Sequence, residues 1–365
     1  MHYHDPHRKN GTITTKVMCA VCFLAFSFLW LYEFQSDVLS VAQHALSNGV
    51  THYDRTIGAV LITVVLQLLQ LGIYAIFRIE HRAHALTYVP SMLILAFISD
   101  IDMDIDRQYS FGAWPYVTPI VLVVWGAALW ASRQMLPFEN DEKAFTGLFS
   151  RRVWINMLQM AVMMLVVAAV GNTNAVFHFR AHAEMATMQS NFDEVLRVGQ
   201  RSHETDATLT MLRANALARR GELGERLFEY PIAGTSINLL PIHSPLQILS
   251  PDSIWRTFGA RTSFCLPAQE FFHFVERDSL ATPAVADYVL CAYLIDRDLE
   301  GFVNALPRYY DGIEKEALPR YYREALDLYD QPHEQPQTTI SDFEHSQGTY
   351  RHYYYYSKPE GKIKK

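Results

Sequence analysis

Four aspartates that alternate with other residues form the clearest candidate metal site in the chain. They are Asp100, Asp102, Asp104 and Asp106. Carboxylate oxygens are the ligands that hard divalent cations prefer. A helix-loop-helix calcium site, however, needs glycine at its sixth position and glutamate at its twelfth, and counting from Asp100 those positions hold Ile105 and Phe111. The run is therefore interpreted as a solvated acidic loop, with metal or partner binding as the alternative.

The four cysteines fall into two pairs of different kinds. Cys19 and Cys22 form a Cys-x-x-Cys spacing inside a long apolar run, where a redox motif would lack water and a partner. They are interpreted as small packing residues. Cys265 and Cys291 are the two cysteines of the C-terminal half. If that half lies outside the cytoplasm, its environment permits a disulfide between them.

Histidines give weaker metal-binding candidates. His178 and His182 are one helical turn apart and could share a metal, but the glutamate of a zinc protease motif is missing between them. His2, His4 and His7 lie at the terminus without a partner carboxylate or cysteine. The sequence also contains no Gly-x-Ser-x-Gly, Walker, dinucleotide or kinase motif. It therefore predicts no catalytic residue and no cofactor.

Tyrosines near the C-terminus are the candidate partner-binding residues. They are Tyr309, Tyr310, Tyr321 and Tyr322, and they belong to a Leu-Pro-Arg-Tyr-Tyr sequence that occurs at 306–310 and again at 318–322. Aromatic side chains at this spacing could line a groove for a ligand. Core packing between successive helices explains the same pattern, so both interpretations stay open.

The chain that must position these residues is divided into two halves of different character. Of its 365 residues, 50% are apolar and 19% are charged, which is ordinary for a globular protein. Long apolar runs nevertheless fill the sequence up to Gly171, whereas charges and tyrosines interrupt short amphipathic segments after it. The net charge of −7 leaves no excess of cations to neutralise phosphates, so a nucleic-acid partner is not expected.

Five apolar segments are candidates for membrane-spanning helices, since roughly 20 residues at 1.5 Å each cover a hydrocarbon core of about 30 Å. They are 14–32, 57–77, 85–99, 113–131 and 153–170. No small-residue cleavage site follows the first, so we interpret it as a retained anchor. The segment 85–99 is the weakest, because Pro90 interrupts it and His84 limits its start. A four-span alternative would place 85–99 in the interface and reverse the side of the C-terminal half.

The positions of lysine and arginine favour five spans with the N-terminus in the cytoplasm, because basic short loops stay on the cytoplasmic side. The nine residues that would be cytoplasmic are Arg8, Lys9, Lys16, Arg78, Arg82, Arg133, Lys143, Arg151 and Arg152. The intervening loops hold Arg55 and Arg107. The spans contain the neutral polar residues Gln67, Gln70, Asn156 and Gln159, which are expected to form helix-to-helix hydrogen bonds. A transporter is therefore disfavoured.

The C-terminal half shows a helical pattern with turns at Ser190 and Gly221, whose separation is close to the period of tetratricopeptide repeats. The stretch 231–267 contains prolines at 231, 241, 245, 251 and 267 and cannot be one helix. Its many apolar residues indicate packing against the helices, with a binding role as the alternative. The residues 331–365 are interpreted as a polar, tyrosine-rich tail.

This arrangement resembles an uncharacterised family of polytopic membrane proteins of the Bacteroides group. The segments that carry the resemblance are 214–228 (ANALARRGELGERLF), 296–302 (DRDLEGF), 318–326 (LPRYYREAL) and 350–356 (YRHYYYY). The resemblance implies several membrane spans followed by a tetratricopeptide-like half that ends in a tyrosine-rich motif. The family has no established activity, so the resemblance implies an architecture and no reaction.

The sequence thus predicts an all-α fold with a five-helix transmembrane domain in 1–171 and a tetratricopeptide-like helical hairpin domain in 172–330. The predicted place is the bacterial inner membrane, with the N-terminus cytoplasmic and the helical domain periplasmic. The predicted function is that of a non-enzymatic scaffold that presents this domain to a protein partner. The alternative is a membrane-associated enzyme or transport component that acts on lipid-linked or glycan substrates.

Overall fold

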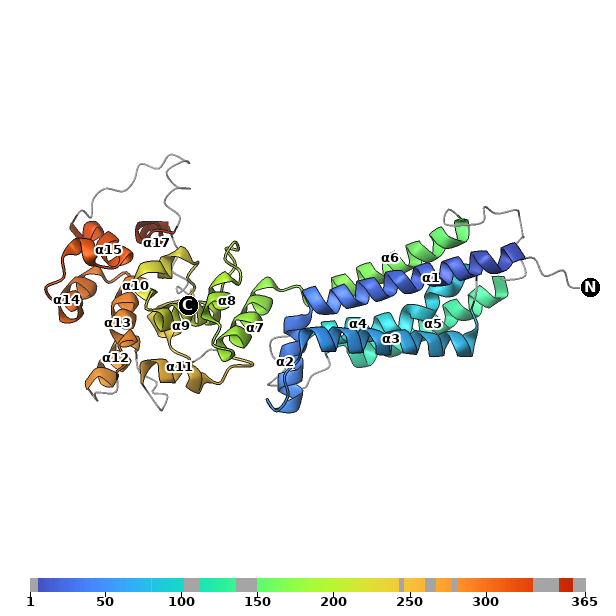
Figure 1. The fold of residues 1–365 in the computed structure, drawn as a ribbon, viewed down its shortest axis with the longest axis horizontal. Helices are drawn as coiled ribbons and strands as arrows, with labels where there is room; N and C mark the ends of the chain where they lie inside the picture. Colours follow the sequence, from blue (N-terminus) through green and yellow to red (C-terminus); the bar gives the residue numbers. More distant parts are fainter. Residues whose placement is uncertain are drawn as a thin grey trace, which may run out of the picture. The chain divides into compact units, whose positions relative to one another are not determined.

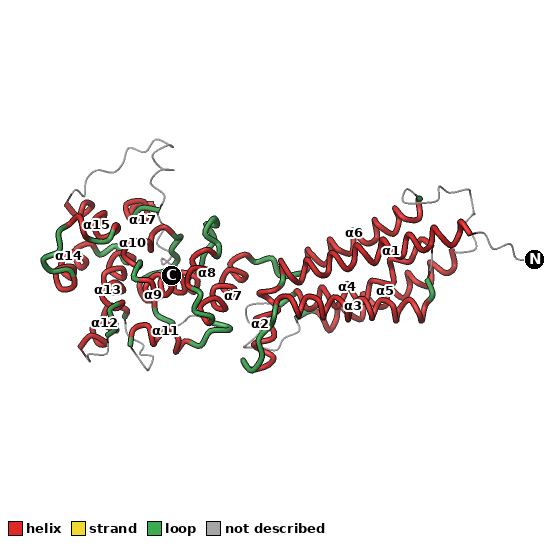
Figure 2. The backbone as a smooth tube through the Cα atoms, in the orientation of Figure 1, coloured by secondary structure: helices red, strands yellow, loops and turns green. Residues whose placement is uncertain are grey.

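The computed structural model of the chain is helical, and no strand occurs in the residues that it describes (Figure 1 and Figure 2). The described residues are 6–79, 81–101, 112–135, 150–242, 246–259, 267–277, 281–330 and 348–356. The chain divides into two compact units, Met1–Thr173 and Asn174–Lys365. We call them the membrane unit and the C-terminal unit.

The membrane unit is a bundle of long helices, with one short helix that crosses the end of the bundle (Figure 1). Its elements are α1 (Pro6–Leu29), the π-helix η1 (Trp30–Phe34), α2 (Ser36–Ser47), α3 (Arg55–Phe77), the 3₁₀-helix η2 (His81–Tyr88), α4 (Val89–Ser99), α5 (Trp114–Met135) and α6 (Arg151–Val170). The crossing helix is α2, whereas α1, α3, α4, α5 and α6 run alongside one another.

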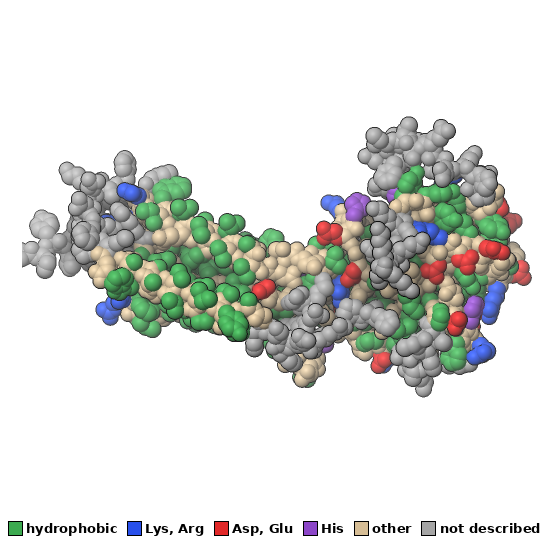
Figure 3. All heavy atoms as spheres, turned by 180° about the vertical axis from the view of Figure 1, so that it is seen from behind, with side chains coloured by type: hydrophobic (Ala, Val, Ile, Leu, Met, Phe, Trp, Pro, Cys, Tyr) green, Lys and Arg blue, Asp and Glu red, His purple; other side chains and the backbone are tan. Residues whose placement is uncertain are grey.

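Among the described residues of this unit, four helices are long and apolar enough to cross a membrane. They are Ile13–Phe34, Arg55–Phe77, Trp114–Gln134 and Arg151–Val170, and they match four of the five predicted spans. Their apolar side chains face outwards, as Figure 3 shows, and Leu68 and Leu165 are 60% and 70% exposed. Because such a surface is stable only in lipid, the chain is a membrane protein. The remaining predicted span, 85–99, falls in a shorter apolar helix, Ala83–Ser99.

The C-terminal unit consists of shorter helices packed around α9 and α13. Its elements are α7 (Ala175–Met188), α8 (Phe192–Arg197), α9 (Ala207–Arg220), α10 (Leu223–Arg226), η4 (Leu227–Glu229), η5 (Ser236–Leu239), α11 (Pro251–Phe258), α12 (Ala268–Arg277), α13 (Ala284–Ile295), α14 (Leu299–Tyr309), η6 (Lys315–Ala317), α15 (Arg320–Asp330) and α17 (Tyr350–Tyr356). Residues 208–218 of α9 are all buried, which makes α9 the centre of one apolar core.

Three turns of the C-terminal unit share one backbone conformation. Ser190, Gly221 and Arg297 have φ values of 57°, 70° and 60°, the left-handed region that commonly ends a helix. The residue after each turn donates its N–H back into the preceding helix, for example Asp298 N to Tyr293 O at 2.9 Å. Asp298 then caps α14 by accepting from Gly301 N. The result is a repeated helix-turn-helix connection for α7 and α8, α9 and α10, and α13 and α14.

The described parts of the proline-rich stretch, 231–242 and 246–259, pack against the helices, as the favoured sequence interpretation expects. Its apolar side chains at Leu239, Ile254 and Phe258 are at most 1% exposed. The stretch is held by Glu184 of α7, whose Oε2 accepts from the backbone N–H groups of 247, 248 and 249 at 2.8, 2.6 and 3.1 Å. One buried carboxylate therefore satisfies three donors that belong to no helix.

Residues 348–356 also belong to the core and not to a separate tail. Tyr350 of α17 is fully buried, donates to Leu294 O at 3.1 Å and packs on Phe228 with ring centroids 4.9 Å apart. Tyr353 donates to Ile295 O at 2.8 Å. Within the predicted tail 331–365, the described residues 348–356 are thus part of the core, because α17 packs on α13, α15 and Phe228 of η4.

Candidate functional site

The acidic run lies mostly outside the described residues. Asp100 is exposed and accepts a hydrogen bond from Trp114 Nε1 at 2.7 Å, whereas Asp102, Asp104 and Asp106 are not described. Within the described residues, no group of three or more His, Cys, Asp or Glu side chains is placed to hold a metal ion. His182 of the predicted histidine pair instead lies 3.3 Å from Glu194. The metal-binding alternative for the acidic run remains a prediction.

The structure describes one of the two cysteines of the C-terminal half, Cys291. Cys291 on α13 has no exposed surface, and burial raises the pKa of its thiol above the ordinary value. Its Sγ lies 3.7 Å from the hydroxyl of Tyr322. Cys265 lies outside the described residues, so the disulfide between them stays a prediction. Cys19 of the Cys-x-x-Cys spacing is buried in the apolar core of the membrane unit, as a packing residue would be.

The four candidate tyrosines divide into a buried pair and a half-buried pair. Tyr321 and Tyr322 of α15 have no exposed surface, and their hydroxyls donate to Gly348 O and Asp287 Oδ1, each at 2.8 Å. Burial raises the pKa of both hydroxyls above the ordinary value. These two side chains pack in the core, so direct contact with a partner is open to Tyr309 and Tyr310 at the end of α14.

Tyr309 and Tyr310 are held by two carboxylates. Tyr309 Oη donates to Glu276 Oε1 at 2.5 Å, and Tyr310 Oη donates to Asp287 Oδ1 at 2.8 Å. Burial raises the pKa of both tyrosines, and the neighbouring carboxylates add to the effect. Both hydroxyls therefore stay protonated donors at neutral pH. Fixed aromatic rings at a surface lose little conformational entropy on contact with a partner.

Exposed groups surround this pair of tyrosines. Arg308, 59% exposed in its side chain, lies 3.1 Å from Glu276, and His273 lies 3.3 Å from the same carboxylate. Ile313, in the turn after α14, is 45% exposed. We call Arg308, Tyr309, Tyr310 and Ile313 the α14 surface. It combines aromatic, apolar and guanidinium groups, the types that contribute most to protein interfaces.

Neutral polar side chains connect the helices of the membrane unit, as the sequence predicts. Gln70 of α3 donates through Nε2 to Thr87 Oγ1 of η2 at 2.9 Å. Asn156 of α6 accepts at Oδ1 from the backbone N–H of Ala85, also in η2, at 2.8 Å. The helix-to-helix interpretation is thus confirmed for Gln70 and Asn156. The polarity of these two residues inside apolar runs made the hydrogen bonds predictable. Nothing in the sequence indicated that both bonds would be made to η2.

The comparisons with known proteins concern the C-terminal unit. Residues 267–362 match a family of unknown function (DUF6057), and the match extends from α12 to α17. No curated protein and no solved structure matches the chain. The match fits the resemblance to an uncharacterised family, and it contains the α14 surface and the tyrosine-rich helix α17.

Proposed function

We propose that this protein is a scaffold of the bacterial inner membrane, in which five spans anchor a periplasmic, tetratricopeptide-like domain that binds a protein partner. The observation that carries the proposal is the contrast between the two units. The membrane unit exposes leucine and valine along its long helices, whereas the C-terminal unit buries its apolar residues between short helix pairs. Stacked helix pairs of this kind form extended surfaces suited to protein partners.

The length of the third predicted segment, 85–99, supports five spans. The 15 residues at 85–99 would measure only about 22 Å as an α-helix. The structure starts the segment earlier, at His81, and forms eight residues of 3₁₀-helix before the eleven residues of α4. With rises of about 2.0 and 1.5 Å per residue, the apolar part Ala83–Ser99, which leaves out His81 and Arg82, reaches about 28 Å, close to a hydrocarbon core of about 30 Å.

Backbone hydrogen bonding supports the same conclusion. Pro90 has no N–H, so the carbonyl of Leu86 in the 3₁₀-helix η2 can have no donor four residues later, and the 3₁₀ bond to residue 89 is the one left to it. Trp125 Nε1 of α5 donates to this carbonyl at 2.8 Å. Asn156 accepts from Ala85 N on another side of η2. An irregular segment is tolerated at membrane depth when neighbouring helices satisfy its backbone in this way.

The α14 surface is the proposed contact for the partner. Its tyrosines are fixed by Glu276 and Asp287, and its exposed members are Arg308 and Ile313. A partner that covers Ile313 would gain apolar burial next to two rigid rings, which is the composition of an interface centre. The surface also lies within the segment 267–362 that matches the family of unknown function.

Affinity purification of the full-length protein in mild detergent tests this proposal. Ile313→Asp places a charge on the α14 surface, and Met188→Asp is a matched control on α7, because the two side chains are 45% and 40% exposed. We expect wild type and Met188→Asp to retain a stoichiometric protein, and Ile313→Asp to bind it about 30-fold more weakly, as for loss of a contact worth about 2 kcal/mol. Equal retention by all three proteins, or no retained protein, would contradict the proposal.

A further inference from the structure

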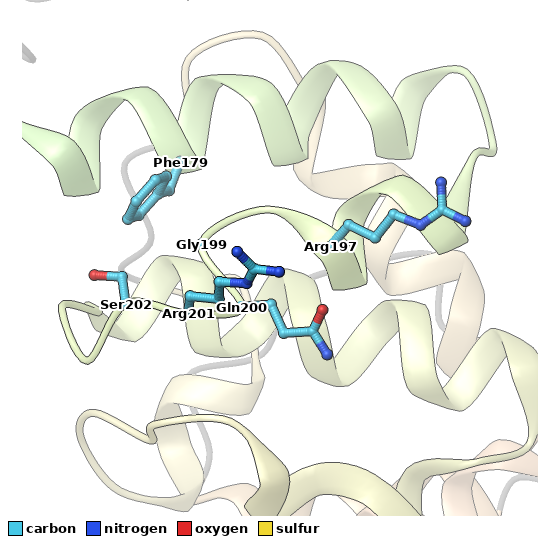
Figure 4. A pocket seen from close by; sticks show the side chains of 6 residues that line it. All are labelled: Phe179, Arg197, Gly199, Gln200, Arg201 and Ser202. Atoms are coloured by element: carbon cyan, nitrogen blue, oxygen red, sulfur yellow. The ribbon is translucent and has the colours of Figure 1, made fainter.

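A shallow basin lies in the C-terminal unit between α7 and the loop that joins α8 to α9 (Figure 4). Its volume is about 480 Å³, and it is lined by Phe179, Arg197, Gly199, Gln200, Arg201 and Ser202. The volume exceeds that of a single inorganic ion. The basin therefore has room for an ionic group together with an organic part, and Phe179 provides an apolar wall.

Two side chains in the basin have donors that the protein itself leaves unused. Within the described residues, the side chains of Arg201 and Gln200 make no hydrogen bond or ion pair. Figure 4 shows Arg201 in the middle of the basin, between Gly199 and Gln200. Arg197 is directed away from it and lies 3.9 Å from Glu194. Arg201 is therefore the cation best placed to meet a ligand.

A third guanidinium is buried next to the basin. Arg213 of α9 is 1% exposed, and its Nη2 donates to the carbonyls of Val198 and Gly199 at 3.0 and 3.4 Å. Its Nε and Nη1 have no hydrogen-bond partner among the described residues. Burial lowers the pKa of Arg213 to about 10, so the group remains a cation at neutral pH. The nearby carboxylate of Asp206 and the ring of Tyr230, 5.3 Å from the guanidinium carbon, offset part of the cost of burying this cation, and an anion near the two unused donors would offset more.

Gly199 brings the buried cation and the basin together. Its φ of 62° is in the left-handed region, and a Cβ there would lie 2.9 Å from the ring of Phe179 and 3.1 Å from Arg213 Nη2. Glycine thus allows the backbone to pass between the apolar wall and the guanidinium. Arg213 consequently lies directly against a residue that lines the basin, where its charge adds to that of Arg201.

We propose that this basin binds a phosphate group carried by an organic molecule or by a lipid headgroup. Arg201 provides a planar pair of N–H donors, Gln200 provides an amide, and Arg213 contributes a second positive charge from beneath. A phosphate monoester has three terminal oxygens for such donors, whereas a carboxylate or a phosphodiester has two. The apolar ring of Phe179 contacts the organic part of the ligand.

Calorimetric titration of the full-length protein with inorganic phosphate, in a maltoside detergent whose headgroup carries no phosphate, tests the site. Arg201→Gln removes the central cation, and Arg256→Gln removes an exposed arginine on α11 as a control. We expect Arg201→Gln to weaken phosphate binding about tenfold, which corresponds to about 1.4 kcal/mol, and Arg256→Gln to leave it unchanged at constant ionic strength. Absence of saturable binding by the wild type, or equal affinity of all three proteins, would overturn the proposal.

Lipid nanodiscs distinguish the two sources of the phosphate. If a lipid headgroup occupies the basin, added inorganic phosphate will bind the wild type more weakly in nanodiscs that contain phosphatidylglycerol than in the detergent. If the ligand is a free organic phosphate, the affinity for inorganic phosphate will be equal in the detergent and in the nanodiscs. In either case Arg201→Gln must bind inorganic phosphate more weakly than the wild type in the detergent.

Discussion

Glu184 shows how one side chain can hold a long irregular segment in place. The carboxylate is 1% exposed, and three consecutive backbone N–H groups of the proline-rich stretch converge on its Oε2. Loss of a buried acceptor costs about 1–3 kcal/mol for each donor left unpaired. Burial of the carboxylate raises its pKa above the ordinary value, although the three N–H groups and Arg180 act in the opposite direction.

This raised pKa predicts a pH dependence of stability. The folded protein binds the Glu184 proton more tightly than the unfolded chain, whose glutamates titrate near pH 4.3. The free energy of unfolding should therefore fall as the pH rises from about 4.3 to the folded pKa, and the loss should level off above it. Glu184→Gln keeps one acceptor but cannot ionise, so it should remove this part of the profile. Denaturant unfolding between about pH 4 and pH 8 measures the effect.

Glu204→Gln is the matched control, since Glu204 is exposed on the loop before α9. It should leave the shape of the pH profile unchanged. Identical profiles for Glu184→Gln and the wild type would show that the carboxylate titrates alike in the folded and unfolded states.

At the scale of the element, the segment of η2 and α4 gains its length from a helix that begins in the 3₁₀ form. Pro90 occupies the first turn of α4, where a missing N–H is tolerated, and it offers no N–H to the Leu86 carbonyl four residues earlier. Trp125 from α5 and Asn156 from α6 add hydrogen bonds to the backbone of η2. The neighbouring helices therefore stabilise an element that would be unfavourable alone in lipid.

Trp125→Phe tests this dependence, because it removes the indole N–H and keeps an aromatic ring. We expect a loss of about 1 kcal/mol in the stability of the membrane unit, since polar contacts between membrane helices are worth about 0.6–2 kcal/mol. Trp130→Phe on the same helix is the control, because Trp130 is 66% exposed. Thermal unfolding in detergent should place Trp125→Phe below both the control and the wild type. Equal unfolding temperatures would mean that the bond to Leu86 contributes nothing.

The membrane elements were predictable because their signal is local. A run of apolar residues identifies a long span by itself, and Gln70 and Asn156 stand out as polar positions within such runs. The 3₁₀ start of the third segment was not predictable, although Pro90 indicated a break. Its conformation depends on Trp125, which lies 39 residues away in the sequence. The conformation of the short helices in the C-terminal unit likewise depends on contacts with residues far away in the sequence.

The contacts of the candidate sites were harder to predict than the helices that carry them. A tyrosine run reads as polar and exposed, yet Tyr350 is buried because Phe228 and Tyr321 form a matching apolar surface far away in the chain. Likewise, the repeated Leu-Pro-Arg-Tyr-Tyr sequence does not distinguish the half-buried Tyr309 from the buried Tyr321. The role proposed for Arg213 could not be predicted from the sequence, because it depends on two guanidinium donors that have no partner in the part of the folded chain that the structure describes.

For the whole molecule, the number of membrane crossings decides where the C-terminal unit works. With five crossings and a cytoplasmic N-terminus, Arg151 lies in the cytoplasm and the C-terminal unit lies outside it. If the segment of η2 and α4 does not cross, both positions change sides. The two topologies therefore make opposite predictions for two positions in one chain, and this allows each position to serve as the control for the other.

Single cysteines distinguish the topologies in a chain whose four native cysteines have been replaced. Glu300→Cys on α14 and Arg151→Cys at the start of α6 introduce thiols at exposed positions. We expect a membrane-impermeant maleimide to label Glu300→Cys in intact cells, and to label Arg151→Cys only after the membrane is permeabilised, because basic residues at span ends stay in the cytoplasm. The reverse pattern would show that the segment of η2 and α4 does not cross. The C-terminal unit would then meet its partner in the cytoplasm, and the basic residues at 133–152 would lie outside against the usual bias.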